Sequence, residues 1–128
     1  MGQFNNSKVI ELKKKDFKKL ENNSIIITHN NFKNKNGLLF VHADWCGFCK
    51  ITKPEIIKLA EITNNEFPIG ELEDIHKDVI KMLNIKGFPT IFIIKNGIIN
   101  EEYNDKRQTK SIINNICNIN DYKFCNNK

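Results

Sequence analysis

The sequence lacks a long apolar run, and none of its apolar stretches approaches the about 20 residues needed to span a membrane. The N-terminal "MGQFNNSKVI" has no apolar segment typical of a secretory signal peptide, and the C-terminal "CNNK" is no ER-retention tetrapeptide. We therefore expect a cytoplasmic protein that binds no membrane. If the source is viral, a virus particle or viral factory is an alternative location.

Arginine and tryptophan are scarce, with one residue each, Arg107 and Trp45. By contrast, 21 Ile, 20 Asn and 19 Lys residues dominate the composition, which indicates A/T-rich codon usage. The formal net charge is +5, but the lysines are scattered apart from the run 13–15. Nucleic-acid binding would require a clustered basic patch, so we expect a solvated surface and no nucleic-acid partner.

Cysteine is also limited, to four residues, and two of them lie three positions apart in "ADWCGFCK" (43–50). In a reducing cytosol, such a close pair is catalytic or metal-binding more often than structural. Zinc is disfavoured because the other two cysteines are separated by seven residues, so we expect no metal. Cys117 follows Ile113 and Ile116 on an apolar helical face and is predicted to be a buried inert thiol. Cys125 lies in the polar tail, and we expect its thiol either to be free or to form a disulfide with a partner.

Apolar periodicity predicts alternating strands and helices in one domain. Asn96-Gly97 is a strong hairpin signal, whereas the earlier strands need crossovers and hence parallel pairing. The expected fold class is α/β, with a central mixed sheet (parallel plus an antiparallel hairpin) flanked by helices on both faces. The domain is assigned to 23–120, with an N-terminal extension or first strand in 1–22 and a polar tail in 121–128. The first strand of the core is expected at either 9–12 or 24–28, and further strands at 38–43, 67–72, 90–95 and 98–103. A helical turn is expected within 13–23. Longer helices are expected at 47–64, with a kink at Pro54, at 75–83, with Asp74 as its cap, and at 110–119.

Cys46 falls where a buried strand ends and a helix begins. The free N–H groups and positive dipole end of that helix favour the thiolate, which is the reactive form of cysteine. Cys49 lies one helical turn deeper on the same side. Cys46 can thus attack a substrate disulfide, and Cys49 can resolve the mixed disulfide. Trp45 and Phe48 offer an apolar landing surface for a protein substrate.

The motifs "WCGFCK" with Pro54 and "IKGFPT" (85–90) resemble the thioredoxin superfamily, over residues 25–119. The segment "EYNDKRQTKSII" resembles the end of protein disulfide isomerase catalytic domains, with Tyr103 and Arg107 matching. The resemblance implies the thioredoxin fold and a thiol-disulfide oxidoreductase without cofactor. It assigns a redox-active disulfide to Cys46 and Cys49, with Cys46 as nucleophile and Cys49 as resolving thiol, and supporting positions at Trp45, Gly47, Phe48, Phe88, Pro89 and Arg107.

In this family, Phe88-Pro89 matches the cis-proline loop, which lies against the two sulfurs and pairs with substrate backbone. Arg107 matches an arginine that favours the resolving thiolate by its permanent charge, although an ordinary surface arginine is the alternative. Asp105 stands where the family has glycine.

Two further positions depart from the family. Its buried acid, which exchanges a proton with the resolving thiol, is replaced by Phe40. Strand alternation places His42 on the same face, so we hypothesise that His42 partly takes over this proton transfer; an aromatic filler is the alternative. Phe48 stands where thioredoxins have proline and disulfide isomerases have histidine. Unlike proline, Phe48 retains a backbone N–H that can point at the Cys46 thiolate and stabilise the reduced form, and unlike histidine it adds no charge. We therefore predict a reduction potential between those of the two families, roughly −270 to −180 mV.

The leading interpretation is an oxidoreductase acting as a monomer on thiols and disulfides of protein substrates, with a reductase or a thiol oxidase upstream. The direction of electron flow stays open. A glutaredoxin-like enzyme is a lesser alternative, disfavoured by Trp45 before the cysteine pair. A different class is a non-catalytic binding module, such as a chaperone or an assembly subunit, including one of a virion.

Overall fold

The computed structural model describes residues 4–127, in which seven strands form one sheet in the order β1-β5-β4-β6-β7-β3-β2. β5 runs parallel to both β1 and β4, and the remaining neighbours are antiparallel. The strands are β1 Ile10–Glu11, β2 Phe17–Lys19, β3 Ile25–Ile27, β4 Gly37–His42, β5 Ile69–Glu73, β6 Thr90–Lys95 and β7 Ile98–Glu102, and the α-helices are α1 Gly47–Thr63, α2 Lys77–Met82 and α3 Thr109–Ile119.

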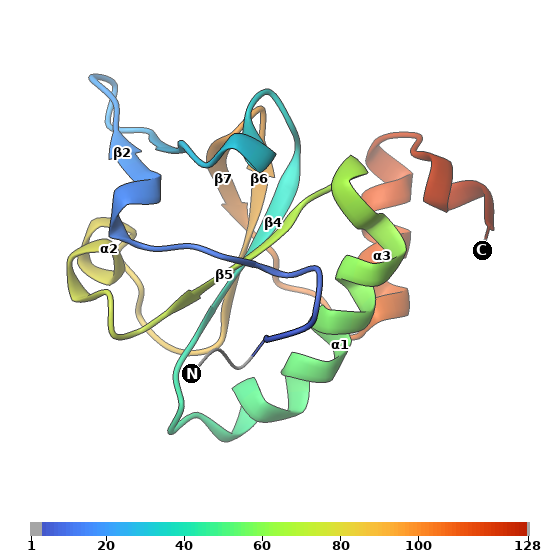
Figure 1. Ribbon diagram of the computed structural model, residues 1–128, viewed down its shortest axis with the longest axis horizontal. Helices are drawn as coiled ribbons and strands as arrows, with labels where there is room; N and C mark the ends of the chain where they lie inside the picture. The colour runs from blue at the N-terminus through green and yellow to red at the C-terminus, as the bar shows by residue number, and fades with distance from the viewer. Residues whose placement is uncertain (1–3, 128) are drawn as a thin grey trace.

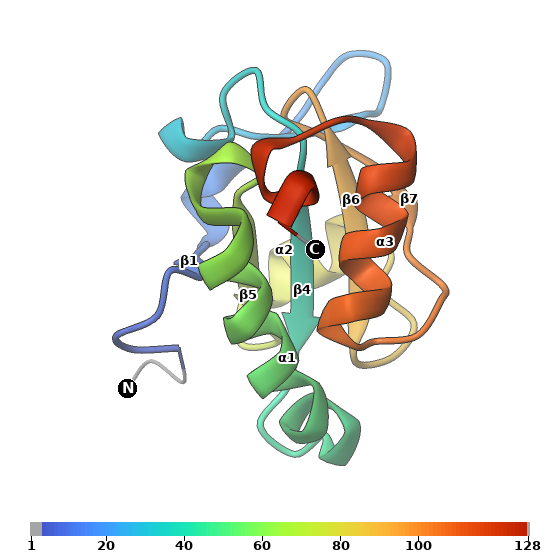
Figure 2. The same ribbon diagram turned by 90° about the vertical axis from the view of Figure 1, so that its right-hand side faces the viewer.

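Helices cover both faces of the sheet, with α1 and α3 side by side on one face and α2 on the other (Figures 1 and 2). Alternation along β4 divides its side chains between two cores. Phe40 packs in the core under α1 and α3, whereas Leu39 and Val41 pack in the core toward α2. The expected mixed sheet with helices on both faces is confirmed. None of the helices in residues 4–127 is long and apolar enough to span a membrane.

The edges of the sheet differ from the prediction in detail. Both candidate first strands are present, because β1 pairs with β5 while β3 pairs with β7. The helical turn expected within 13–23 is a short 3-10 turn, Lys14–Asp16, followed by β2, which pairs with β3. The helix expected at 75–83 is shorter, and His76 rather than Asp74 occupies its N-cap position.

Apart from Gly97, asparagine supplies the positive-φ backbone positions of the described chain. Asn6, Asn23, Asn34, Asn64, Asn84 and Asn96 all have positive φ, between 52° and 71°. Asparagine tolerates this conformation better than most other non-glycine residues, because its short polar side chain bonds locally. The abundant asparagines therefore have a structural use at turns as well as a compositional origin.

The C-terminal segment folds back onto the domain, where Cys125 forms a disulfide with Cys117 of α3. The prediction of a buried inert thiol at Cys117 is therefore wrong, and Cys125 is neither free nor paired with another chain. Phe124 and Cys125 are buried. The Tyr122 ring stacks on Phe124, with ring centroids 5.1 Å apart. The disulfide therefore holds the stacked rings of Tyr122 and Phe124 against α1 and α3.

Candidate active site

Cys46 and Cys49 form a disulfide at the start of α1. Cys46 has extended backbone and is the N-cap of the helix, and its Sγ accepts a hydrogen bond from the N–H of Cys49 at 3.1 Å. The sequence predicts the Phe48 amide as the donor to Cys46, whereas the donor in the structure is the Cys49 amide. A fixed amide donor on Cys46 Sγ stabilises negative charge there when the disulfide opens.

The two cysteines differ little in exposure, since Cys46 is 6% and Cys49 4% exposed. Both cysteines lie just after the carboxyl end of β4, where α1 begins. From there α1 runs back alongside the sheet (Figure 1). Gly47 occupies the first helical position, where an added Cβ would meet nothing within 4 Å. Glycine is therefore not sterically required between the cysteines.

Trp45 stands beside the pair as a fixed, exposed surface. Its side chain is 70% exposed, yet its indole Nε1–H donates to Asp74 Oδ2 at 3.1 Å. Its ring also packs edge-on against Phe88, with centroids 5.5 Å apart. The tryptophan thereby joins the cysteine loop to the proline loop and presents its free surface to solvent.

Other large apolar side chains extend the exposed surface from Trp45. Phe48, which lies between the two cysteines, is 68% exposed, and Ile51, two residues after Cys49 in α1, is 70% exposed. Ile75 is 63% exposed in the loop just after Asp74, the partner of Trp45. Phe48 and Ile51 line one surface depression, and exposed apolar side chains that gather on a protein surface mark interaction sites. We call Trp45, Phe48, Ile51 and Ile75 the apolar rim.

The Phe88-Pro89 peptide bond is cis. Thr90 Oγ1 donates to the Gly87 carbonyl at 2.7 Å and helps to close the turn. Arg107 is exposed and lines two surface depressions, one with Phe88 and Pro89 and one with Phe48 and Ile51. The structure thus brings Arg107 next to the proline loop and the apolar rim.

The segment before α3 is held by Tyr103 and Asp105. The Tyr103 hydroxyl donates to the Lys106 carbonyl at 2.5 Å, and burial raises the pKa of Tyr103 to about 12. Asp105 Oδ1 accepts from the Lys106 N–H, and this hydrogen bond lowers the pKa of Asp105. Asp105 is not among the positive-φ residues, so its backbone does not need the glycine found in the family.

His42 is buried, and its Nε2 lies 2.5 Å from Glu71 Oε1 of β5. Glu71 is 5% exposed and stands opposite Phe40 in the parallel β4–β5 ladder. Glu71 is not predicted as a site residue from the sequence, although the alternation of its strand indicates that it is buried. The expected strand 67–72 carries one carboxylate on the same side as Phe67 and Ile69, which are both buried.

Comparison with known proteins agrees with this geometry. The family model for thioredoxin matches residues 8–118. Protein disulfide-isomerase 2-3 of Arabidopsis thaliana is 36% identical over 95 residues, which are 69% of this chain and 22% of that protein. Thioredoxin of Mycoplasma genitalium is 38% identical over 65 residues, covering 50% of this chain and 63% of that protein.

Among solved structures, the zinc-bound form of human ERp44 superposes with a TM-score of 0.70 at 21% identity, over 88% of this chain and 30% of that one. The J-Trx1 fragment of ERdj5 gives the same TM-score at 15% identity, over 88% of this chain and 51% of the fragment. These likenesses concern the fold. The chain spans about a fifth of the length of the disulfide isomerases it matches. The relatives and the Cys46–Cys49 pair support the predicted chemistry, thiol-disulfide exchange.

Proposed function

The chain belongs to the thioredoxin family, and on this premise we propose that it catalyses thiol-disulfide exchange with cysteines of protein substrates. One observation carries the proposal. The Cys46–Cys49 disulfide lies at the N-terminus of α1, and the largely exposed Trp45 and Phe48 of the apolar rim flank Cys46 and Cys49 in the sequence. The redox pair supplies the reaction and the apolar rim supplies a surface for a protein.

In the reducing direction, the Cys46 thiolate attacks a substrate disulfide and forms a mixed disulfide, releasing one substrate sulfur as thiolate. Cys49 then attacks Cys46 Sγ, the bond to the substrate breaks, and the second substrate thiolate leaves. The substrate gains two electrons and the Cys46–Cys49 pair loses them. The oxidising direction is the same sequence reversed, so the external partner, a reductase or a thiol oxidase, sets the direction.

The rim favours a polypeptide over a small thiol. Trp45 and Phe48 stand on either side of Cys46 in the sequence, so a bound chain can contact both while its own sulfur reaches Cys46. The cis Phe88-Pro89 bond holds a turn at this surface, beside Trp45. A substrate segment pairing with this turn would receive backbone hydrogen bonds without dependence on sequence. Arg107, between the rim and the turn, would favour acidic residues near the target cysteine.

The experiment is exchange with a disulfide-bonded test protein in both directions, using glutathione buffers as electron donor or acceptor. We expect catalysis by the wild-type protein and none by the Cys46→Ser variant. A Cys117→Ser/Cys125→Ser variant is the matched control, because it removes the other cysteine pair and leaves the rim intact. Equal rates for wild type and Cys46→Ser would refute the proposal and favour a non-catalytic binding module.

The cellular compartment stays a prediction from the sequence, which favours the cytoplasm. Disulfides persist mainly in oxidising compartments, so Cys117–Cys125 provides a readout of location. Acid quenching and alkylation of whole cells would count free thiols in this pair. Free thiols at Cys117 and Cys125 would agree with the cytoplasm, and a fully formed disulfide in a secretory fraction would contradict it.

A further inference from the structure

A pair of buried ionisable side chains lies on β4 and β5, close to the end of β4 that leads to Cys46. His42 and Glu71 have side-chain exposures of 3% and 7%, and they contact each other at 2.5 Å. They come from adjacent strands, β4 and β5. Burying two such groups is costly unless each finds a hydrogen-bond partner, and the contact between His42 Nε2 and Glu71 Oε1 gives each side chain that partner.

Two aromatic rings pack against the His42 side of this pair. The Phe40 ring stacks on His42, with centroids 5.5 Å apart, and the Phe4 ring meets His42 edge-on at 5.4 Å. Phe4, Phe40, Cys46 and Cys49 belong to one buried cluster. The His42–Glu71 pair therefore borders the same apolar interior as the resolving cysteine.

Cys49 needs a proton acceptor in this interior. With 4% exposure, its sulfur has little access to water, yet it must lose a proton before it attacks Cys46 and regain one when the disulfide is reduced. Building on the exchange reaction proposed above, we infer that the His42–Glu71 pair takes the proton of Cys49 when the mixed disulfide is resolved and returns it in the reverse step.

Resolution of the mixed disulfide moves one proton and one electron pair. In the mixed disulfide, Cys46 Sγ is bonded to a substrate sulfur and Cys49 is a thiol. The proton of Cys49 passes to the His42–Glu71 pair, and the resulting thiolate bonds to Cys46 Sγ. The bond between Cys46 and the substrate breaks, and its electron pair leaves on the substrate sulfur, which takes a proton from solvent. The pair later loses its extra proton to solvent.

The other ionisable groups around this region are engaged or exposed. Asp74 accepts from Trp45 Nε1 and lies 3.6 Å from Lys77 Nζ, and Tyr103 donates to a carbonyl. Lys53 Nζ lies over the outer Phe4 ring, 5.4 Å from its centroid. Glu73 is half-buried, whereas Asp44 and Lys50 are exposed. His42 and Glu71 thus form the buried ionisable pair on the α1 side of the described sheet.

The test separates the two chemical steps. Fully reduced protein is mixed with a disulfide-bonded test protein, quenched in acid and alkylated, and the mixed disulfide is followed by mass over time at several pH values. Glu71→Gln keeps the volume of the side chain and removes its charge. Glu101→Gln makes the same change on an exposed position of β7 and is the matched control.

A second variant guards against misfolding. Removing one member of a buried pair leaves the other uncompensated, whereas replacing both with apolar residues of similar volume is often tolerated. His42→Phe/Glu71→Met therefore removes the pair while keeping an aromatic ring against Phe40. A circular dichroism melt checks that each variant is folded.

We expect mixed-disulfide formation within about twofold of wild type and resolution slowed at least about tenfold in both variants, because general acid–base groups contribute that much or more. We also expect the resolution rate of the variants to rise with pH more steeply than that of wild type, since only solvent then accepts the proton. Unchanged resolution in the folded double variant would overturn the inference while leaving the exchange reaction intact. If the wild-type protein forms no mixed disulfide, the proposed function itself fails and the inference with it.

Discussion

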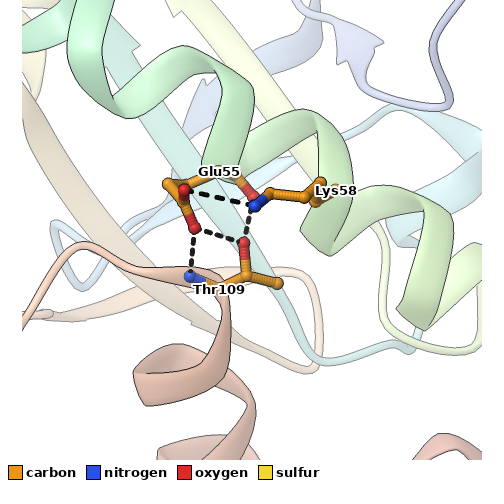
Figure 3. Close-up of polar contacts among 3 residues, drawn as sticks. All are labelled: Glu55, Lys58 and Thr109. Atoms are coloured by element: carbon orange, nitrogen blue, oxygen red, sulfur yellow. Dashed lines mark hydrogen bonds and ion pairs between the residues drawn. The ribbon is translucent and has the colours of Figure 1, made fainter.

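Glu55 of α1 caps the first turn of α3 through Thr109. Its Oε1 accepts from the Thr109 N–H at 2.8 Å and from the Thr109 hydroxyl at 2.6 Å, while Lys58 Nζ approaches Oε2 at 3.4 Å (Figure 3). The N-cap residue of α3, Gln108, makes no side-chain cap of its own. A carboxylate on a neighbouring helix thus supplies the acceptor that helix N-termini require.

The Glu55→Ala variant should therefore be less stable by about 1 kcal/mol, the usual value of a cap, which corresponds to about 4 °C in Tm for a chain of this size. Thermal and urea melts measure this change. Glu61→Ala, at an exposed position of the same helix, is the control and should change stability little. An equal effect of both substitutions would mean that Glu55 acts only through helix propensity.

The Glu55 cap also makes the stability of the protein depend on pH. The hydrogen bonds from Thr109 lower the pKa of Glu55 below its ordinary 4.5. A carboxyl group whose pKa is lowered on folding adds stability that is complete above its unfolded pKa and is lost as the pH falls through the folded one. The stability difference between wild type and Glu55→Gln should be constant above about pH 5 and shrink below about pH 4.5. A difference that persists in acid would contradict the assignment.

The Cys117–Cys125 disulfide should contribute stability without taking part in exchange. Closing a loop of this length is worth about 2–3 kcal/mol in the chain-entropy account. Cys117→Ser/Cys125→Ser should lower the free energy of unfolding in urea by about that amount and leave the exchange rate within about twofold. Loss of exchange at temperatures where this variant is folded would show that the second pair has a redox role.

The apolar rim should matter for protein substrates only. Phe48→Ala should raise KM for a protein disulfide about tenfold, because an aromatic contact in an interface is worth 1–2 kcal/mol, and leave the rate with a small disulfide reagent nearly unchanged. Ile119→Ala removes a comparably exposed apolar side chain on α3 and serves as the control. A uniform loss with both substrates would instead place Phe48 in the chemical step.

The residue between the cysteines should tune the reduction potential of the pair. Phe48→His brings a partial positive charge close to Cys46 and stabilises its thiolate, which makes the disulfide more oxidising. We expect the potential to rise by about 30 mV, equivalent to about 1.4 kcal/mol, relative to a wild-type value within roughly −270 to −180 mV. Equilibration with graded glutathione buffers measures both values. An unchanged potential would mean that the fixed Cys49 N–H donor dominates the energetics of Cys46 Sγ.

The sequence predicts the centre of the fold better than its edges. β6 and β7 follow from alternation and Asn96-Gly97, because the turn and the strands are specified locally. β1 and β2 are two and three residues long, and they exist as strands only because β5 and β3 offer partners. Local patterns therefore cannot distinguish β2 from the helical turn expected in that lysine-rich segment.

The residues of the candidate site likewise divide into those that local sequence predicts and those that meet only through the fold. Cys46, Cys49 and Trp45 are predictable because their function depends on neighbours along the chain. Glu71 meets His42 only through strand pairing, at a sequence separation of 29. The Cys117–Cys125 bond likewise depends on the return of the chain after α3.

Trapping of the mixed disulfide tests the central claim most directly. A Cys49→Ser variant keeps the nucleophile Cys46 but cannot release the substrate, whereas Cys46→Ser cannot attack it. Each variant is incubated with a disulfide-bonded protein, quenched in acid, then alkylated and analysed on a non-reducing gel with mass identification of the bridge. Our account predicts a covalent complex through Cys46 with Cys49→Ser and no complex with Cys46→Ser. A complex bridged through Cys117 or Cys125, or none with either variant, would contradict it.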